Sequence, residues 1–131
     1  MGFMSDAFFD YHGWQAWLER AGMPPASAAI GLLQREDHSA RCGTLLLLSS
    51  RAEGCRVALR EDNEAPGDDV AVLLVADADS FAMLRGAGLE KLPGLIRQGR
   101  LHAFMLKTLD ELEAAGLAEF VEDLGLVFPR H

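Results

Sequence analysis

The feature that most restricts the fold is a run of seven apolar residues, Val70–Ala76, which is bounded by Asp69 and Asp77. An unbroken apolar run of this length is typical of a strand that is buried on both faces in the centre of a sheet. A transmembrane helix needs about 20 apolar residues, and no longer apolar run occurs elsewhere in the chain. We therefore predict a protein built on a sheet, with no membrane insertion.

Three further segments have the composition of strands: residues 30–35, 44–49 and 55–61. The last of them alternates between apolar and polar residues, as a half-buried strand does. Short, turn-rich segments connect the four strands, and neighbours joined by short links are antiparallel because a parallel crossover needs about a dozen residues. These strands predict an antiparallel β-meander. Residues 52–61 also fit a helix, and that alternative, which would make the sheet parallel, stays open.

Apolar residues recur at helical spacing on both sides of the predicted meander. The predicted helices are residues 10–21, 80–85, 89–98 and 109–124, and a strand is predicted over residues 101–107. Trp14 and Trp17 are expected to anchor the first helix onto the core. Asp79 or Ser80 is expected to cap the second helix, and Thr108 begins a capping box at the last one.

These elements define an α+β fold: an antiparallel β-meander sheet covered by N-terminal, central short and C-terminal helices. The chain has 131 residues, a length that predicts a single domain over residues 1–131. A chain of this size buries roughly two-thirds of the surface that it exposes when unfolded. The fold therefore needs no disulfide framework, and Cys42 and Cys55 are interpreted as reduced thiols of a cytoplasmic protein.

The chain is acidic, with 20 Asp and Glu against 12 Lys and Arg and a net charge of -8. A general nucleic-acid binder needs a basic face, so we expect no nucleic-acid partner, and docking on anionic lipid is disfavoured for the same reason. The charge is unevenly spread. Residues 61–79 carry seven acids and residues 108–123 carry six, without a base in either segment, whereas residues 85–107 carry five bases and one acid.

The sequence lacks the familiar catalytic and phosphate-binding motifs. It contains no nucleophile elbow, no P-loop and no His-Glu-x-x-His pair. Asp77 and Asp79 could hold a divalent cation but also suit a helix start, and His38 with Cys42 supplies only two of the four ligands of a structural zinc site. We therefore expect no catalytic residue, no metal and no cofactor, and an enzyme is the less favoured class.

Several short motifs between roughly residues 44 and 124 resemble the sterol-carrier-protein-2 family. The matching segments are Asp69-Val70 at the start of a strand, Asp77-Ala78-Asp79-Ser80-Phe81 leading into a helix, Gly86 at a helix break, and Gln98-Gly99-Arg100-Leu101 at the start of the next strand. The resemblance implies non-enzymatic binding of an apolar ligand, a lipid or an acyl chain, in a cavity between the sheet and the short helices. The expected lining residues are Phe81, Leu84, Leu92, Leu95, Ile96 and Phe104.

Two alternatives come from other classes of protein. The small size, the negative net charge and the helix–meander–helix order of elements are similar to those of the type III secretion chaperones. This resemblance implies a small acidic homodimer that binds a partner protein. The segments 70–75, 89–99, 101–106 and 109–117 also look like the DsrE-like sulfur-relay family, which implies a parallel sheet and a helix over residues 52–61. In that family a relay cysteine lies near the end of the strand matching residues 101–107, and this chain has no cysteine there.

Overall fold

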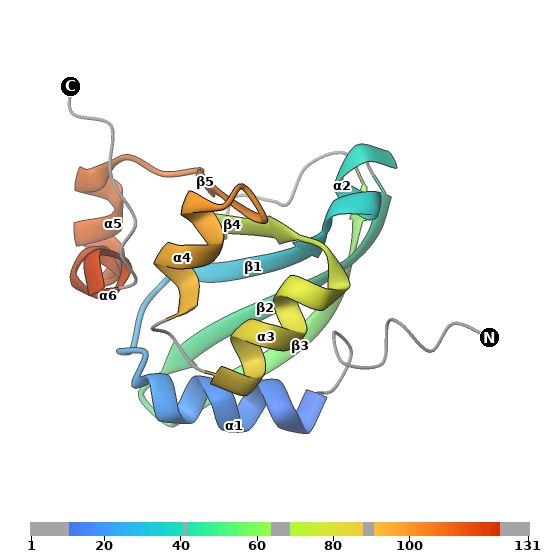
Figure 1. Cartoon of the computed structure of the whole chain (residues 1–131). Coiled ribbons are helices and arrows are strands. Elements are labelled where there is room, and N and C mark those ends of the chain that lie inside the picture. The colour runs from blue at the N-terminus through green and yellow to red at the C-terminus, as the bar shows by residue number, and fades with distance from the viewer. Residues whose placement is uncertain (1–10, 41, 64–68, 88–90, 124–131) are drawn as a thin grey trace.

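A five-stranded sheet with five helices packed on one of its faces forms the body of the computed structural model (Figure 1), which describes residues 11–40, 42–63, 69–87 and 91–123. The strands are β1 (Ala29–Gln34), β2 (Cys42–Arg51), β3 (Gly54–Asn63), β4 (Val70–Ala76) and β5 (Leu101–Met105). The helices are α1 (Tyr11–Ala21), α2 (Arg35–Ala40), α3 (Ala78–Ala87), α4 (Leu92–Arg97), α5 (Leu109–Ala115) and α6 (Ala118–Asp123). The predicted α+β class and its mostly antiparallel sheet are confirmed.

The strand order is β3-β2-β1-β4-β5, which differs from a simple meander at one place. β4 does not follow β3 in space: it lies beside β1, and these two strands are parallel. The other three pairs are antiparallel. The difference has a physical reason: β3 carries Arg56, Arg60 and Glu61, and charged side chains suit a strand at the edge of a sheet, whereas all seven residues of β4 are buried.

The alternative helix over residues 52–61 is wrong. Residues Gly54–Asn63 form strand β3, which pairs with β2 along its whole length from Arg51↔Gly54 to Cys42↔Asn63. Gly54 has φ +135°, a conformation that favours glycine and suits the tight turn between the two strands. The parallel sheet implied by the DsrE-like resemblance is therefore absent from the described residues, apart from the β1–β4 pair.

Side chains alternate between the two faces of the sheet and form two separate clusters. We call the face that carries α1, α3, α4, α5 and α6 the helix face, and the opposite one the bare face. The helix-face cluster joins Leu32, Leu46 and Leu74 to buried residues of those five helices. The buried members of the bare-face cluster are Ala29, Leu33, Leu45, Leu47, Val70, Leu73 and Val75, all of which come from strands.

Helix α1 is held on β3 by polar contacts as well as by burial. Its Gln15 donates from Nε2 to the Cys55 carbonyl oxygen at 2.8 Å and accepts at Oε1 from the Val57 N–H at 3.1 Å. These bonds use the backbone groups of an edge strand that would otherwise face water. Trp14 and Trp17 are buried in the core, as the sequence predicts.

The helix boundaries depart from the prediction at three points. Asp77, rather than Asp79 or Ser80, caps α3, because its Oδ1 accepts the Ser80 N–H at 2.7 Å. A short helix, α2, follows β1, and a Cβ on Gly43 would overlap the Asp37 side chain of that helix. The predicted last helix is divided into α5 and α6 at Gly116, which has φ +87°.

The capping box of α5 is confirmed. Thr108 accepts the Glu111 N–H at 3.2 Å, and the Glu111 carboxylate accepts the Thr108 N–H at 2.8 Å. The Thr108 N–H, which donates to the Glu111 carboxylate, is the main cause that holds the pKa of Glu111 below its ordinary value, and the Thr108 side chain lowers it further. Within the described residues, no helix has the length and apolar composition that crossing a membrane requires.

Candidate functional site

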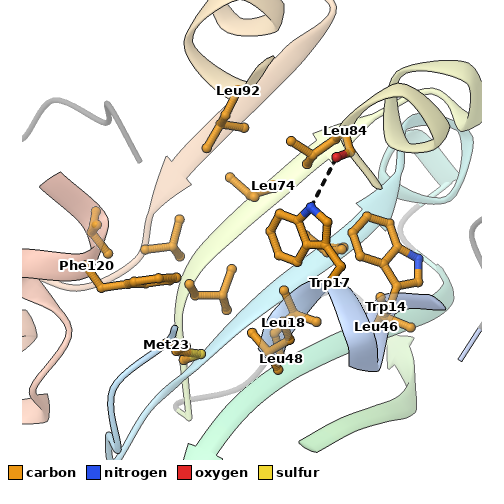
Figure 2. Packing of buried hydrophobic residues seen from close by; sticks show 14 of the residues in the cluster. Trp14, Trp17, Leu18, Met23, Leu46, Leu48, Leu74, Leu84, Leu92 and Phe120 are labelled. Carbon is orange, nitrogen blue, oxygen red and sulfur yellow. Dashed lines mark hydrogen bonds between the residues drawn. The ribbon is translucent and has the colours of Figure 1, made fainter. Parts of the chain in front are cut away.

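The candidate site is the part of the helix-face cluster that lies beneath α3 and α4 (Figure 2). The floor comes from β4, where Leu74 points from the sheet toward the two helices. Leu84 reaches this layer from α3 and Leu92 from α4. Each helix contributes apolar residues at i and i+3, the spacing that places side chains on one helical face.

The structure brings five of the six predicted lining residues to this layer. Phe81, Leu84, Leu92 and Leu95 are buried members of the helix-face cluster, and Ile96 is partly buried against it. Phe104 lies elsewhere. Its neighbours Ala103 and Met105 pack against the helix-face cluster, so alternation along β5 puts Phe104 on the bare face.

Phe104 is 40% exposed and its ring stacks on His38 of α2, with the ring centroids 5.2 Å apart and an interplanar angle of 27°. Because sequence patterns predict a loop rather than a helix around His38, they carry no signal for this pair. The stack joins the helix after β1 to the edge strand β5, on the face opposite the candidate site.

An aromatic wall closes the site on the α1 side. The Trp14 ring meets the Trp17 ring edge to face at 5.4 Å and the Phe81 ring edge to face at 6.2 Å. Trp17 also donates from Nε1 to the Leu84 carbonyl oxygen at 3.1 Å. Sequence periodicity predicts that both tryptophans lie in the core, but their contact with α3 joins residues 67 positions apart and has no local sequence signal.

Charged groups lie at the end of the site where β1 and β4 finish. Arg35 follows β1 and donates from Nη2 to the Arg100 carbonyl oxygen at 2.9 Å, just before β5 begins. Asp77 follows β4, and hydrogen bonding to the adjoining Ser80 is the main cause of the lowered pKa of its carboxyl. The positive charges of Arg100 and Arg35 lower that pKa further.

The chemistry available to the site is therefore packing rather than acid–base catalysis. Its lining is aromatic and aliphatic, and the indole N–H of Trp17 is already committed to a carbonyl oxygen. Among the residues that the structure describes, no three His, Cys, Asp or Glu side chains are grouped as a metal site would need. The candidate ligand Asp77 is used as a helix cap, and the side chain of Cys42 lies outside the described residues.

Comparison with known proteins gives a structural similarity. No protein-family model matches the chain, and no curated protein matches it. The fold is similar to the solution structure of a conserved hypothetical protein from Thermus thermophilus that is described as a possible sterol carrier protein. The two chains are 16% identical with a TM-score of 0.40, and the match covers 95% of this chain and 87% of that one.

Proposed function

We propose that this protein binds an apolar ligand, a lipid or an acyl chain, between the sheet and the short helices α3 and α4, and that it does so without catalysis. The observation that carries the proposal is the convergence of Phe81 and Leu84 from α3 with Leu92 and Leu95 from α4 on one continuous apolar layer. The residues come from two separate short helices, so a ligand would lie between helix and sheet once one of these helices moves outward.

The size of these helices supports the proposal. α3 has ten residues and α4 has six, and isolated helices shorter than about 12 residues are marginal in water. Their position on the sheet therefore depends on side-chain packing. Elements of this kind open at a lower free energy than central strands do. An apolar chain that replaced the leucine contacts would recover part of the cost of such an opening.

The outer surface of α3 supports a route to the site. Met83 lies between Phe81 and Leu84 in sequence and is 42% exposed. An unbranched thioether side chain adapts to ligands of different shape. We place the mouth of the site at Met83, with the Trp17–Leu84 hydrogen bond behind it as the contact that an incoming chain would disturb.

Intrinsic fluorescence tests the proposal, because both tryptophans of the chain belong to the aromatic wall. Purified protein is titrated with a long-chain fatty acid, and the same sample is examined by native mass spectrometry beside a solvent extract. We expect a saturable change in tryptophan emission and a bound mass of lipid size. An unchanged emission spectrum together with a ligand-free mass would contradict the proposal.

A matched pair of variants locates the site. Met83→Glu places a charge at the proposed mouth, and we expect the dissociation constant for the fatty acid to rise by about tenfold or more because a carboxylate resists burial beside an acyl chain. Leu59→Glu is the control, since Leu59 has a similar exposure of 46% but lies on β3. Equal affinity losses in the two variants would place the ligand elsewhere.

A further inference from the structure

Strand β5 forms one edge of the sheet and carries an exposed apolar surface. The order of the described strands ends at β5 on one side and at β3 on the other. The described residues include five large apolar side chains that are well exposed, and three of them, Phe104, Leu106 and Leu109, fall within six residues of sequence. We call these three residues the β5 edge patch.

The backbone of β5 leaves hydrogen-bonding groups directed away from the sheet. The Leu106 N–H donates to the Ala71 carbonyl oxygen at 2.9 Å, and Phe104 pairs with Leu73 in the same ladder. Because bonding direction alternates in an antiparallel pair, Ala103 and Met105 direct their N–H and C=O groups away from β4. A further strand could pair with these groups.

The opposite edge is protected by charge, and β5 is not. β3 carries Arg56, Arg60 and Glu61, and Arg60 pairs with Asp69 at 2.9 Å. Charged side chains are a common means of preventing edge strands from pairing. Residues 103–106 of the β5 segment carry no charge at all, which is the composition of an edge that pairs.

We propose that a second copy of this chain pairs antiparallel with β5 about a two-fold axis, so that the two sheets join into one. We infer a second copy of the chain because the charges at the two ends of β5 are complementary in this arrangement. Basic Arg97 and Arg100 precede β5, and acidic Asp110 and Glu111 follow it after Lys107. In a two-fold antiparallel pair, the beginning of each β5 lies beside the end of the other, so each basic segment meets an acidic one.

The same arrangement covers the apolar patch. Phe104 and Leu106 point to one face of β5, and each would meet the neighbouring strand of the partner copy. Leu109 lies at the start of α5, next to the acidic residues of the proposed contact. The pairing thus buries the apolar side chains at the centre and leaves the opposite charges at the rim, as stable interfaces do.

Light scattering during size-exclusion chromatography of the full chain tests the proposal, with Leu106→Lys and Leu59→Lys as a matched pair. Leu59 is 46% exposed but lies on β3, at the other edge. We expect a dimer for the unmodified chain and for Leu59→Lys. For Leu106→Lys we expect a dissociation constant raised about a hundredfold or more, because each copy would have to bury a lysine charge beside the partner strand. A monomeric unmodified chain, or a dimer that only Leu59→Lys disrupts, would overturn the proposal.

A second variant separates pairing from folding. Ala103→Pro removes an N–H that faces away from β4, so it blocks an added strand and leaves the β4–β5 ladder intact. We expect a monomer whose thermal unfolding, measured at low concentration, stays close to that of the unmodified monomer. Raised salt should weaken the unmodified dimer as well, since opposite charges at the rim are screened. A dimer that persists in Ala103→Pro would contradict pairing through β5.

Discussion

The two faces of the same sheet are built in different ways. The helix face combines aromatic rings, leucines from four helices and polar anchors such as Gln15 and Trp17. The buried residues of the bare-face cluster are small or aliphatic, and all come from strands. At the middle of β1, the bare face has Gly31, and a Cβ there would lie 3.1 Å from the Leu45 Cδ1 atom and 3.2 Å from the Leu73 Cδ1 atom.

This difference shows where the molecule has room to change. On the helix face, side chains of separate short helices share one layer, so the layer can separate when a helix moves. On the bare face, neighbouring strands are joined by backbone hydrogen bonds, and the side chains close over the position of Gly31. Proteins pack their interiors densely on both kinds of surface, but among the described residues the helix-face cluster draws on separate helices, which is why we place the proposed ligand there.

The largest effect on stability is expected when a buried side chain of the helix face is removed. Phe81→Ala removes a fully buried ring that meets Trp14 edge to face. The lost burial and the cavity left behind should lower the free energy of unfolding by about 3–5 kcal/mol. Urea denaturation followed by tryptophan emission measures this, because the tryptophans report on that layer.

Met83→Ala is the control for this prediction, since Met83 lies on the same helix but is 42% exposed. Its removal should lower the free energy of unfolding by no more than about 0.5 kcal/mol, as is usual for surface positions. Similar losses in the two variants would show that α3 is not packed on the sheet through Phe81, and the contrast between the two faces would fail.

A smaller effect on stability is expected when a side chain is added within the bare face. Gly31→Ala adds a methyl group that the neighbouring side chains Leu45, Val70 and Leu73 can accept only by shifting. Overpacking of this kind costs about 1–3 kcal/mol, which we expect as a lower midpoint in thermal or urea unfolding.

Gly86→Ala is the control for Gly31→Ala, and we expect it to stabilise the fold instead. Gly86 lies in α3, and a Cβ there would meet nothing within 4 Å. Replacing a helical glycine by alanine should raise the free energy of unfolding by about 0.5–1 kcal/mol. If Gly31→Ala were neutral or stabilising as well, the bare face would have space that the observed distances exclude.

The sequence predicts those parts of the fold that depend on local chemistry. The apolar run Val70–Ala76 forms β4 with the predicted bounds, and the Thr108 capping box is present as expected. Contacts between distant segments are not predictable in this way. The apolar pattern continues through Gly116 as one helix, but the chain turns there because Gly116 packs against the Pro25 carbonyl oxygen and Ser27 donates to the Ala115 carbonyl oxygen at 3.0 Å.

The candidate site follows the same rule. Periodicity groups Phe81 with Leu84 and Leu92 with Leu95, because each pair lies on one short helix. Periodicity cannot show that Phe104 lies apart from these four residues, since this depends on which face of the sheet the helices cover. That face is decided by β4 lying beside β1, a pairing between segments about 40 residues apart for which a short-range pattern carries no signal.

The smallest effect is expected at Asp77, where the helix face begins. Asp77→Ala removes the N-cap of α3 and should lower the free energy of unfolding by about 1 kcal/mol near neutral pH. The folded state lowers the pKa of this carboxyl from its ordinary value of 3.8. Its charge therefore stabilises the fold above that pH, and the stabilisation is lost as the pH falls through the folded pKa. The gap between the unmodified chain and Asp77→Ala should thus shrink below about pH 4.

Asp77→Asn separates the charge from the cap. Asparagine keeps a side-chain oxygen for the Ser80 N–H but does not titrate. The difference in unfolding free energy between Asp77→Asn and Asp77→Ala should therefore stay constant from about pH 3 to about pH 7, as measured by urea denaturation at each pH. If this difference instead changed with pH as the stability of the unmodified chain does, the pH dependence would come from a carboxylate other than Asp77. A constant difference would show that the cap hydrogen bond stabilises the fold without a charge, so that the extra pH dependence of the unmodified chain comes from the ionised Asp77.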